Sequence, residues 1–411
     1  MYENLAILAI FAFVYSAVGG ALERTPFSGA LVFTAFGLAF GTLGLDLLQL
    51  SVGAEGIRTL AELTLALVLF SDASNANLGV LKRKIRLPTR LLAIGLPLTI
   101  LLGFGFGVLL FDDLGLLEIA LIATMLAPTD AALGKAVVTN SAVPADIRES
   151  LNAESGLNDG ICVPVLFVFL AIATGASTEG GTTSLALKLV AEEIGIGLVV
   201  GIGLTAAGSR LLAVCAEKDW LTEIWRQLPV IAMSIGCFAL AQSLGGSGFI
   251  ASFAGGIYFG WVAKEHRHKL LLAAEGNGDT LALITWVVFG AAIVGQSADA
   301  FTWQALIYAL LSLTVIRMLP VFLALSGTGL RTDEKLFMGW FGPRGLASIV
   351  FGVIVFEQQL PGSDTITITV ALTILFSIVA HGISANPLAG ALAVRVKTRK
   401  AAASDLIKDM K

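Results

Sequence analysis

Charged residues are scarce in this chain, and that scarcity excludes a soluble protein. Only 14% of its 411 residues are Asp, Glu, Lys or Arg, whereas 56% are hydrophobic and the mean hydropathy is +0.87. Soluble proteins contain about 25% charged residues. The composition therefore predicts an all-α polytopic membrane protein, in which the 45 glycines allow helices to approach closely.

Cysteine and histidine are also rare, and the N-terminus lacks the features of a cleaved leader. The three cysteines lie in apolar runs without a spacing pattern, so they predict neither a disulfide nor a metal site. No basic region or small-residue cleavage site flanks the first apolar run, and we interpret residues 4–20 as a retained helix. We expect no cofactor and no nucleic-acid partner.

Thirteen apolar stretches are each long enough to cross about 30 Å of hydrocarbon. They cover residues 4–20, 28–45, 59–78, 88–111, 115–138, 146–174, 184–214, 221–244, 248–263, 273–295, 302–325, 334–356 and 364–394. With the N-terminus outside, the inside segments hold 22 of the 26 lysines and arginines. Basic residues concentrate in cytoplasmic loops, so this asymmetry predicts an N-out, C-in topology.

Two of these spans are interrupted in mid-membrane. Pro128 precedes Thr129 and Asp130 in the fifth span, and Gly-Pro-Arg-Gly at residues 342–345 interrupts the twelfth. Proline removes a backbone donor and frees a carbonyl. When spans 1–6 and 8–13 are taken as halves around a linker span, both interruptions fall in the fifth span of a half. This predicts two inverted six-helix repeats with an ion site at the midplane. The simpler alternatives are a kink capped by Asp130 and a cytoplasmic turn at 342–345.

The sixth span carries an unusual polar stretch, Glu-Ser-Gly-Leu-Asn-Asp-Gly at residues 154–160. Ionisable residues are costly inside a membrane and predict function there. Ser155 and Asp159 are four residues apart and share one helix face, while Glu154 and Asn158 share the neighbouring face. We expect the first face to bind a cation and the second to form a hydrogen-bonded scaffold. The alternative is a cytoplasmic loop that leads into the helix.

Other polar residues within the spans receive simpler interpretations. Asp72 is deep and has no local partner, so we place it at or near the site. The others are assigned structural roles: the i,i+4 pairs Arg58–Glu62 and Lys188–Glu192, an anchoring or pairing role for Arg317, a structural or gating role for His381, and a solvated basic loop for His266 and His268.

At these residues the chain resembles the monovalent cation:proton antiporters, specifically the NhaP-type sodium/proton exchangers, over nearly its whole length. The segments that carry the resemblance are residues 70–73, 128–130, 154–160, 342–345 and 379–382. The resemblance implies a homodimer in which each chain forms a single transmembrane domain, residues 1–400. Its expected parts are an ion-carrying core (88–174 and 302–394), a dimer side (4–78 and 221–295), a linker helix (184–214) and a short cytoplasmic tail (401–411).

The resemblance also implies roles for individual residues. Asp159 would carry the ion and the proton, with Asp130 at or beside the ion. The Thr129 backbone and the Ser155 hydroxyl would supply neutral oxygens. Asn158 and Arg344 would hold the Glu154 carboxylate, and these three residues would support the structure of the site. The chain departs from many members of the family by having Asp72 in place of Glu and Ala131 in place of Pro.

These observations predict a transporter rather than an enzyme. We expect exchange of Na⁺ or Li⁺ for H⁺ in a prokaryotic inner membrane, in the service of pH homeostasis. The neutral Asn158, where electrogenic relatives have a second acid, predicts electroneutral 1:1 exchange. The alternatives are K⁺/H⁺ exchange, a Na⁺-coupled symporter of organic solutes, and an intramembrane aspartyl protease, although neither Asp130 nor Asp159 lies in the Gly-x-Gly-Asp signature that such an enzyme needs.

Overall fold

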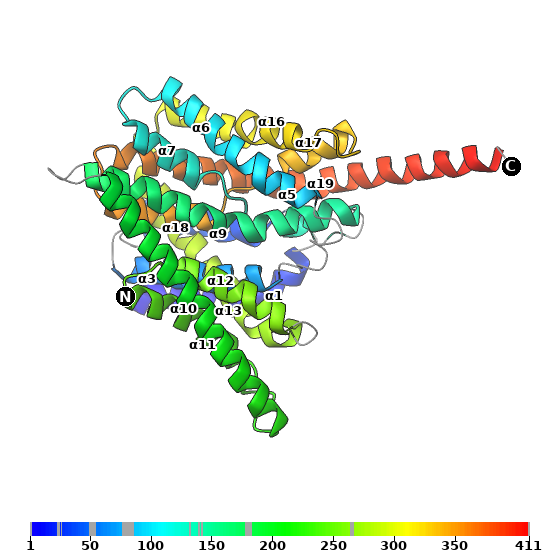
Figure 1. Cartoon of the computed structure of the whole chain (residues 1–411). Helices are drawn as coiled ribbons and strands as arrows, with labels where there is room; N and C mark the ends of the chain where they lie inside the picture. The colour runs from blue at the N-terminus through cyan, green and yellow to red at the C-terminus, as the bar shows by residue number, and fades with distance from the viewer. Residues whose placement is uncertain are drawn as a thin grey trace.

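The chain folds into a bundle of helices (Figure 1). The computed structural model describes residues 2–22, 25, 27–48, 55–75, 86–130, 133–138, 140, 143–176, 183–263 and 267–409. Every regular element within these ranges is a helix, which confirms the all-α class.

The first half of the chain contains the elements up to the long helix α10. They are α1 (Tyr2–Leu22), α2 (Gly29–Phe40), α3 (Glu55–Asn75), α5 (Arg86–Arg90), the π-helix η1 (Leu91–Gly95), α6 (Leu96–Leu110), α7 (Leu116–Met125), α8 (Lys135–Val138), α9 (Ala145–Ala176) and α10 (Thr183–Glu217).

The second half begins at α11 and ends with the longest helix. Its elements are α11 (Leu228–Ser243), α12 (Gly248–Ala263), α13 (Arg267–Val288), the π-helix η3 (Phe289–Val294), α14 (Gly295–Ser297), the 3₁₀ helix η4 (Ala298–Ala300), α15 (Trp303–Leu313), α16 (Val315–Ala324), α17 (Thr332–Trp340), α18 (Leu346–Glu357) and α19 (Ser363–Asp409).

Every one of the predicted spans contains one or more of these helices. Seven helical stretches of the described chain are long and apolar enough to cross a membrane, and five further apolar helices are shorter. The protein is therefore a multi-pass membrane protein.

Several predicted boundaries differ from the structure, and for two of them the sequence explains the difference. The eighth span was expected from residue 221, but α11 begins at Leu228. Pro229 explains this start, because proline has no backbone N–H and is favoured in the first turn of a helix. At the other end, α19 continues to Asp409, beyond the predicted end at 394. Its last part is rich in Ala, Lys and Arg, which are strong helix formers, and has no Gly or Pro to end it.

The helices pack as two groups. One group contains α2, α3 and α10–α13, in which α12 packs against α3 and α10, and α13 packs against α2 and α3. The other contains α5–α8 and α15–α19, with α6 against α7 and α16, and α15 against α19. Helices α9 and α18 contact α3 across the boundary. In Figure 1 the first group lies in the lower part of the view and the second in the upper part.

Several interruptions were not expected from the sequence. The fourth and tenth spans each contain a π-helix, η1 and η3. The eleventh span is divided at Thr314, whose backbone (φ −111°, ψ −94°) is not helical. Wide turns and breaks of this kind often occur at functional sites because they redirect side chains.

The i,i+4 pairs and the basic loop can be compared with the structure only in part. Lys188 and Glu192 form the expected i,i+4 ion pair, with 3.8 Å between their charged atoms, which confirms that prediction. The side chains of Arg58 and His268, and all of His266 and Ala131, lie outside the described residues.

Candidate functional site

The two interrupted spans meet in the interior of the bundle. Helix α7 ends at Met125 and α17 ends at Trp340, and each is followed by a non-helical segment. The backbone N–H of Asp130, in the first segment, donates to the carbonyl of Pro343 in the second, at 2.8 Å. The turn alternative for residues 342–345 is wrong, because this segment is buried and is bonded to the other interrupted helix.

Asp130 caps a helix that belongs to the other half of the chain. Its Oδ2 accepts from the N–H of Leu346, the first residue of α18, at 2.8 Å, and its Oδ1 accepts from the N–H of Leu133 at 3.0 Å. In return, the Ser348 hydroxyl of α18 donates to the carbonyl of Met125, the last residue of α7, at 2.7 Å. A carboxylate at a helix N-terminus is stabilised by the helix dipole. The capping interpretation of Asp130 is thus confirmed, although the helix α18 that it caps belongs to the other half of the chain.

The crossing depends on a glycine. A Cβ atom added at Gly345 would lie only 1.8 Å from Asp130 Oδ2, so no side chain fits there without moving the capping carboxylate. Gly342 is similarly constrained, since its Cβ would lie 2.3 Å from Nε of Arg317. These two glycines of the Gly-Pro-Arg-Gly segment therefore permit close approach of the two helix ends.

We expect Gly345→Ala to destabilise the protein by about 1–3 kcal/mol, because the added methyl group displaces Asp130 from the α18 N-terminus. Thermal melting of the detergent-purified protein measures this. Gly105→Ala, at a helical glycine with no atom within 4 Å of the added Cβ, is the matched control and should melt at or above the wild-type temperature. Equal melting of both variants would show that the close approach is unimportant.

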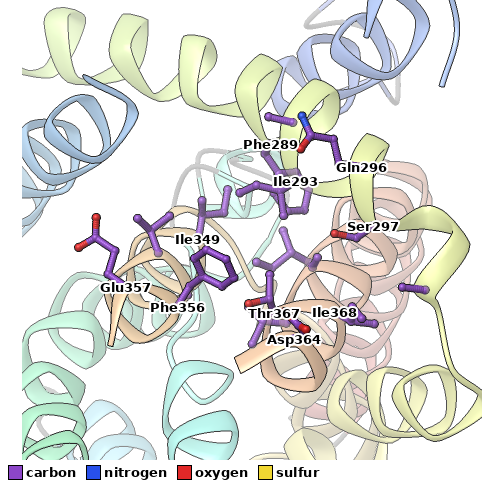
Figure 2. Close-up of a pocket in the computed structure, with 17 residues that line it drawn as sticks. Phe289, Ile293, Gln296, Ser297, Ile349, Phe356, Glu357, Asp364, Thr367 and Ile368 are labelled. Atoms are coloured by element: carbon purple, nitrogen blue, oxygen red, sulfur yellow. The ribbon is translucent and has the colours of Figure 1, made fainter. Parts of the chain in front are cut away.

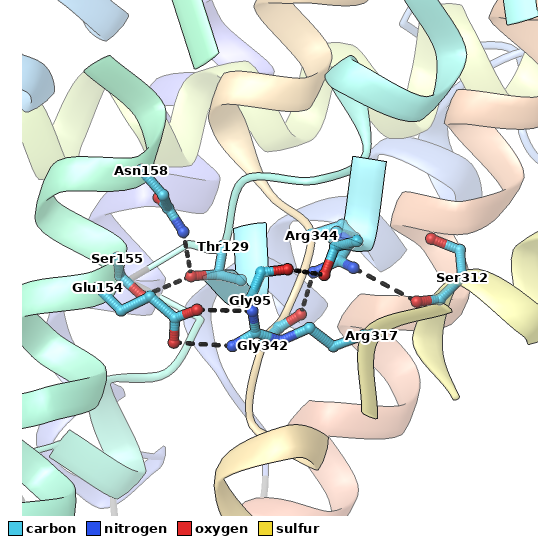
Figure 3. Close-up of polar contacts among 10 residues, drawn as sticks. Gly95, Thr129, Glu154, Ser155, Asn158, Ser312, Arg317, Gly342 and Arg344 are labelled. Carbon is cyan, nitrogen blue, oxygen red and sulfur yellow. Dashed lines mark hydrogen bonds and ion pairs between the residues drawn. The ribbon is translucent and has the colours of Figure 1, made fainter. Parts of the chain in front are cut away.

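The polar stretch of α9 is attached to the first interrupted segment through Thr129. The Thr129 hydroxyl lies 2.9 Å from the Ser155 hydroxyl and accepts a hydrogen bond from Asn158 Nδ2 at 2.7 Å (Figure 3). Asn158 was expected to hold Glu154, and that expectation is wrong. The reason is that Asn158 also lies three residues after Ser155, so both side chains can reach the same partner.

Asp159 is a buried carboxylate with an unused oxygen. Its side chain is only 7% exposed, and Oδ1 accepts no hydrogen bond from the described part of the chain. Oδ1 of the adjacent Asn158 is also buried and accepts no hydrogen bond from the described residues. A buried, unpaired polar atom costs about 1–3 kcal/mol, and more when it is charged. Such a group favours binding a proton or a cation.

Asp72 and Asp130 lie close enough to Asp159 for the three carboxylates to interact electrostatically. Asp72 is half-buried on α3, and its backbone carbonyl would lie 3.4 Å from a Cβ added at Gly156 of α9. The structure therefore brings all three predicted acids to one region, contributed by three segments that are distant in sequence.

Glu154 forms a bidentate ion pair, but its partner is Arg317 rather than Arg344. The guanidinium nitrogens of Arg317 lie 2.6 and 2.8 Å from the two carboxylate oxygens of Glu154, and both side chains are 1% exposed (Figure 3). Arg317 lies three residues after the interruption at Thr314, which separates α15 from α16. One signal could have found this pair, because Arg317 is one of the few basic residues that remain within the predicted spans.

Arg344 instead supports the interrupted helices. Its backbone N–H donates to the Ser377 hydroxyl of α19 at 2.6 Å. Its guanidinium donates to the carbonyls of Gly342 at 2.7 Å and of Ser312 at 3.3 Å. The predicted pairing of Arg344 with Glu154 is therefore wrong. The Arg344 guanidinium donates instead to backbone carbonyls beside the interruptions of the eleventh and twelfth spans.

His381 binds the end of α17. Its Nε2 lies 2.8 Å from the carbonyl of Trp340, the last residue of that helix, and its Nδ1 lies 2.9 Å from the carbonyl of Ser377. It thus joins α19 to the end of the half-helix α17, as expected for a structural role.

Two spans that are interrupted in the interior of the bundle, bond to each other at their interruptions and lie beside a buried carboxylate are typical of a secondary transporter of ions. The chain belongs to the sodium/hydrogen exchanger transmembrane family, which it matches over residues 8–391. This is a family of transporters and not of enzymes.

Comparisons with known proteins agree on the fold. The structure superposes on that of the sodium proton antiporter MjNhaP1 from Methanocaldococcus jannaschii at pH 8 with a TM-score of 0.75, covering 95% of this chain and 99% of that one at 22% identity. The Na⁺/H⁺ antiporter ApNhaP of Aphanothece halophytica is 25% identical over 90% of this chain and 70% of its own. The K⁺/H⁺ antiporter NhaP2 of Shewanella sp. is 23% identical over 66% of this chain, which spans about half (47%) of that relative's length.

Proposed function

We propose that this protein exchanges Na⁺, or Li⁺, for H⁺ across a membrane, with both ions competing for Asp159. The observation that carries the proposal is the buried Asp159 oxygen, which has no partner among the described residues and stands beside two helix ends. Burial favours the neutral, protonated form of a carboxylic acid, whereas a nearby cation favours the ionised form. One group can therefore hold either ion but not both.

The proposed cation ligands are oxygens around the crossing. Asp159 and Asp130 supply carboxylates, Ser155 and Thr129 supply neutral oxygens, and Asp72 is the remaining acid that could reach the ion. No group of three His, Cys, Asp or Glu side chains in the described ranges could hold a metal ion alone. The neutral oxygens are thus essential to the proposal, and hard cations such as Na⁺ accept hydroxyl and carbonyl ligands as well as carboxylates.

The charge balance of the site explains how alternating access couples the movement of Na⁺ to that of H⁺. Either Na⁺ or H⁺ neutralises Asp159, whereas an empty ionised site is costly to move through a low-dielectric interior. The Arg317–Glu154 pair adds no net charge to the moving part. Because Asn158 is neutral, we propose one ion for one proton.

The proposed topology has thirteen spans in two inverted six-helix repeats, with the N-terminus outside. The distribution of Lys and Arg supports it. We further propose a homodimer in a prokaryotic cell membrane, with helices α1–α3 and α11–α13 on the dimer side, α10 as the linker helix, and helices α5–α9 and α15–α19 as the moving core.

K⁺/H⁺ exchange is the second candidate, favoured by the match to a relative named for that activity. Proteoliposomes loaded with a pH-sensitive dye separate the two when Na⁺, Li⁺ and K⁺ are added one at a time. We expect proton movement with Na⁺ and Li⁺ and little with K⁺. A response to K⁺ alone would favour the second candidate, and no response to any of the three would contradict both.

Electroneutrality is tested in the same vesicles on a solid-supported membrane. We expect no current at saturating Na⁺, because one positive charge moves each way in every cycle. A current that scales with the dye response would contradict 1:1 exchange.

A further inference from the structure

Two glycines in the polar stretch of α9 lie against the other packing group. A Cβ added at Gly160 would lie 2.3, 2.4 and 2.5 Å from three ring atoms of Phe253 on α12, so the ring fills the space that any side chain at residue 160 needs. A Cβ at Gly156, one turn earlier, would meet Asp72 of α3 first, at an ordinary 3.4 Å. The surface of α9 therefore has a notch that Phe253 occupies, at Gly160, and a second notch one turn away, at Gly156.

Phe253 is held at a fixed position within its own group, because α12 packs closely on α3. Cβ atoms added at Gly256 and Gly260 of α12 would lie 2.4 and 2.2 Å from the backbone carbonyl oxygens of Phe70 and Ser74. Backbones in such close contact cannot slide past each other without a clash. Any movement at the contact with Gly160 is therefore a movement of α9 and not of Phe253.

Elsewhere the boundary between the two groups is less closely packed. A cavity of about 360 Å³ lies along it, with walls from η3 and α14 on one side and from α18 and α19 on the other (Figure 2). Apolar side chains dominate these walls, among them Phe289, Ile293 and Ile349. Hydrophobic contacts are non-directional, so such surfaces can shift without breaking hydrogen bonds. The aromatic ring seated against the α9 backbone is by contrast a steric obstacle to sliding.

We infer that Phe253, Gly160 and Gly156 form a two-position ratchet, in which the core moves by one helical turn and the ring passes from Gly160 to Gly156. Four residues at a rise of 1.5 Å correspond to about 6 Å. One-turn steps of one packed element past another are a known form of conformational switch. Because α9 runs from inside to outside in the proposed topology, the step carries Asp159 outwards by the same distance. The inference rests on the proposed function, since the moving core is part of it.

Cysteine pairs measure which residue of α9 lies opposite residue 253. They are introduced into a background without the natural cysteines (Cys162→Ala, Cys215→Ser and Cys237→Ala), whose exchange is measured first. Proteoliposomes are treated with copper phenanthroline, and disulfides are counted by mass tagging of the remaining thiols. We expect Gly160→Cys/Phe253→Cys and Gly156→Cys/Phe253→Cys both to oxidise, because each pair comes within disulfide distance in one of the two positions.

The matched control is Ala153→Cys/Phe253→Cys. Ala153 lies seven residues before Gly160, about 10 Å along the helix, on a similar face of α9. A one-turn step does not bring it to residue 253, so we expect at least about tenfold slower oxidation than for the pair at residue 156.

Alanine variants test the role of the ring itself. Gly160→Ala should disfavour the position in this structure and Gly156→Ala the shifted one, each by about tenfold, because the ring then meets a methyl group. The measurement is the distance distribution between spin labels on Asp112→Cys, in an exposed loop of the core, and Leu43→Cys, in the exposed turn after α2. The two variants should change the populations of two distances in opposite directions, and Gly105→Ala, whose Cβ meets no atom within 4 Å, should change neither.

A third variant separates the ring from a general effect of alanine in α9. Phe253→Ala combined with Gly160→Ala should return the populations to those of Phe253→Ala alone, since the methyl group then has room. A persistent effect of Gly160→Ala in the absence of the ring would contradict the ratchet.

Three further outcomes would overturn the inference. The first is a background that exchanges ions while the pair at residue 156 never oxidises. The second is oxidation of the pair at residue 153 as fast as that at residue 156, which indicates a longer step. The third is a pair of alanine variants that shift the populations in the same direction or not at all. If the disulfides and populations behave as expected but no cation drives exchange, the proposed function fails while the ratchet stands.

Discussion

Asp159→Asn is expected to abolish exchange and to leave the fold intact. The amide has nearly the same shape as the acid but cannot take up and release a proton, so neither ion can be exchanged for the other. The fold should tolerate the change because Asp159 Oδ1 has no hydrogen-bond partner in the described part of the protein. The measurements are the dye response in proteoliposomes and the melting temperature in detergent.

The control for Asp159→Asn is Asp112→Asn, which removes one acid from an exposed loop and should exchange at the wild-type rate. Exchange by Asp159→Asn at more than a few per cent of that rate would remove Asp159 from the mechanism. A melting temperature equal to or above that of wild type is expected, since burial of an unpaired carboxylate is costly.

Arg317→Ala should be the most destabilising single change in the core. It leaves the Glu154 carboxylate buried, 1% exposed and without its bidentate partner. Removing one member of a buried ion pair costs about 3–5 kcal/mol. The loss should appear as a large fall in melting temperature or as failure to obtain folded protein.

The matched comparison is the double variant Glu154→Ala/Arg317→Ala. Because it removes both charges, it should be more stable than Arg317→Ala alone, since no unpaired charge remains. The stability of Arg344→Ala should fall between those of these two variants. This change leaves the carbonyls of Gly342 and Ser312 unpaired but leaves no unpaired charge, so it should destabilise the protein by about 1–3 kcal/mol. If Arg344→Ala were the more destabilising single variant, the pairing of Glu154 with Arg317 would not be the main support of this site.

Much of the architecture could be predicted from the sequence, because apolar length and backbone chemistry act locally. The apolar runs predicted where helices lie, and Pro128 and Gly342 marked the two interruptions that the structure shows. Helical spacing predicted that Ser155 and Asp159 share one face of α9, and the family resemblance placed them with Thr129 and Asp130; Ser155 does lie beside Thr129.

The partners of the charged residues could not be predicted in the same way. Spacing along α9 defines the faces of Glu154 and Asn158, but it contains no information on which arginine of a distant helix reaches them. The choice of Arg317 depends on the break at Thr314, which no proline or glycine marks in the sequence. The double capping by Asp130 likewise depends on a contact between residues 216 positions apart.

That separation has a consequence for synthesis of the chain. The end of α7 and the carboxylate of Asp130 emerge from the ribosome 216 residues before Leu346, whose N–H completes the cap. At about 5–20 residues per second, this delay is roughly 10–40 s. During that time a charged side chain and free helix carbonyls must be accommodated in the membrane without their final partners. The first half of the protein thus depends on insertion machinery, water or a chaperone until the second half arrives, and a nascent chain stalled before residue 346 should be a preferred substrate for membrane proteolysis.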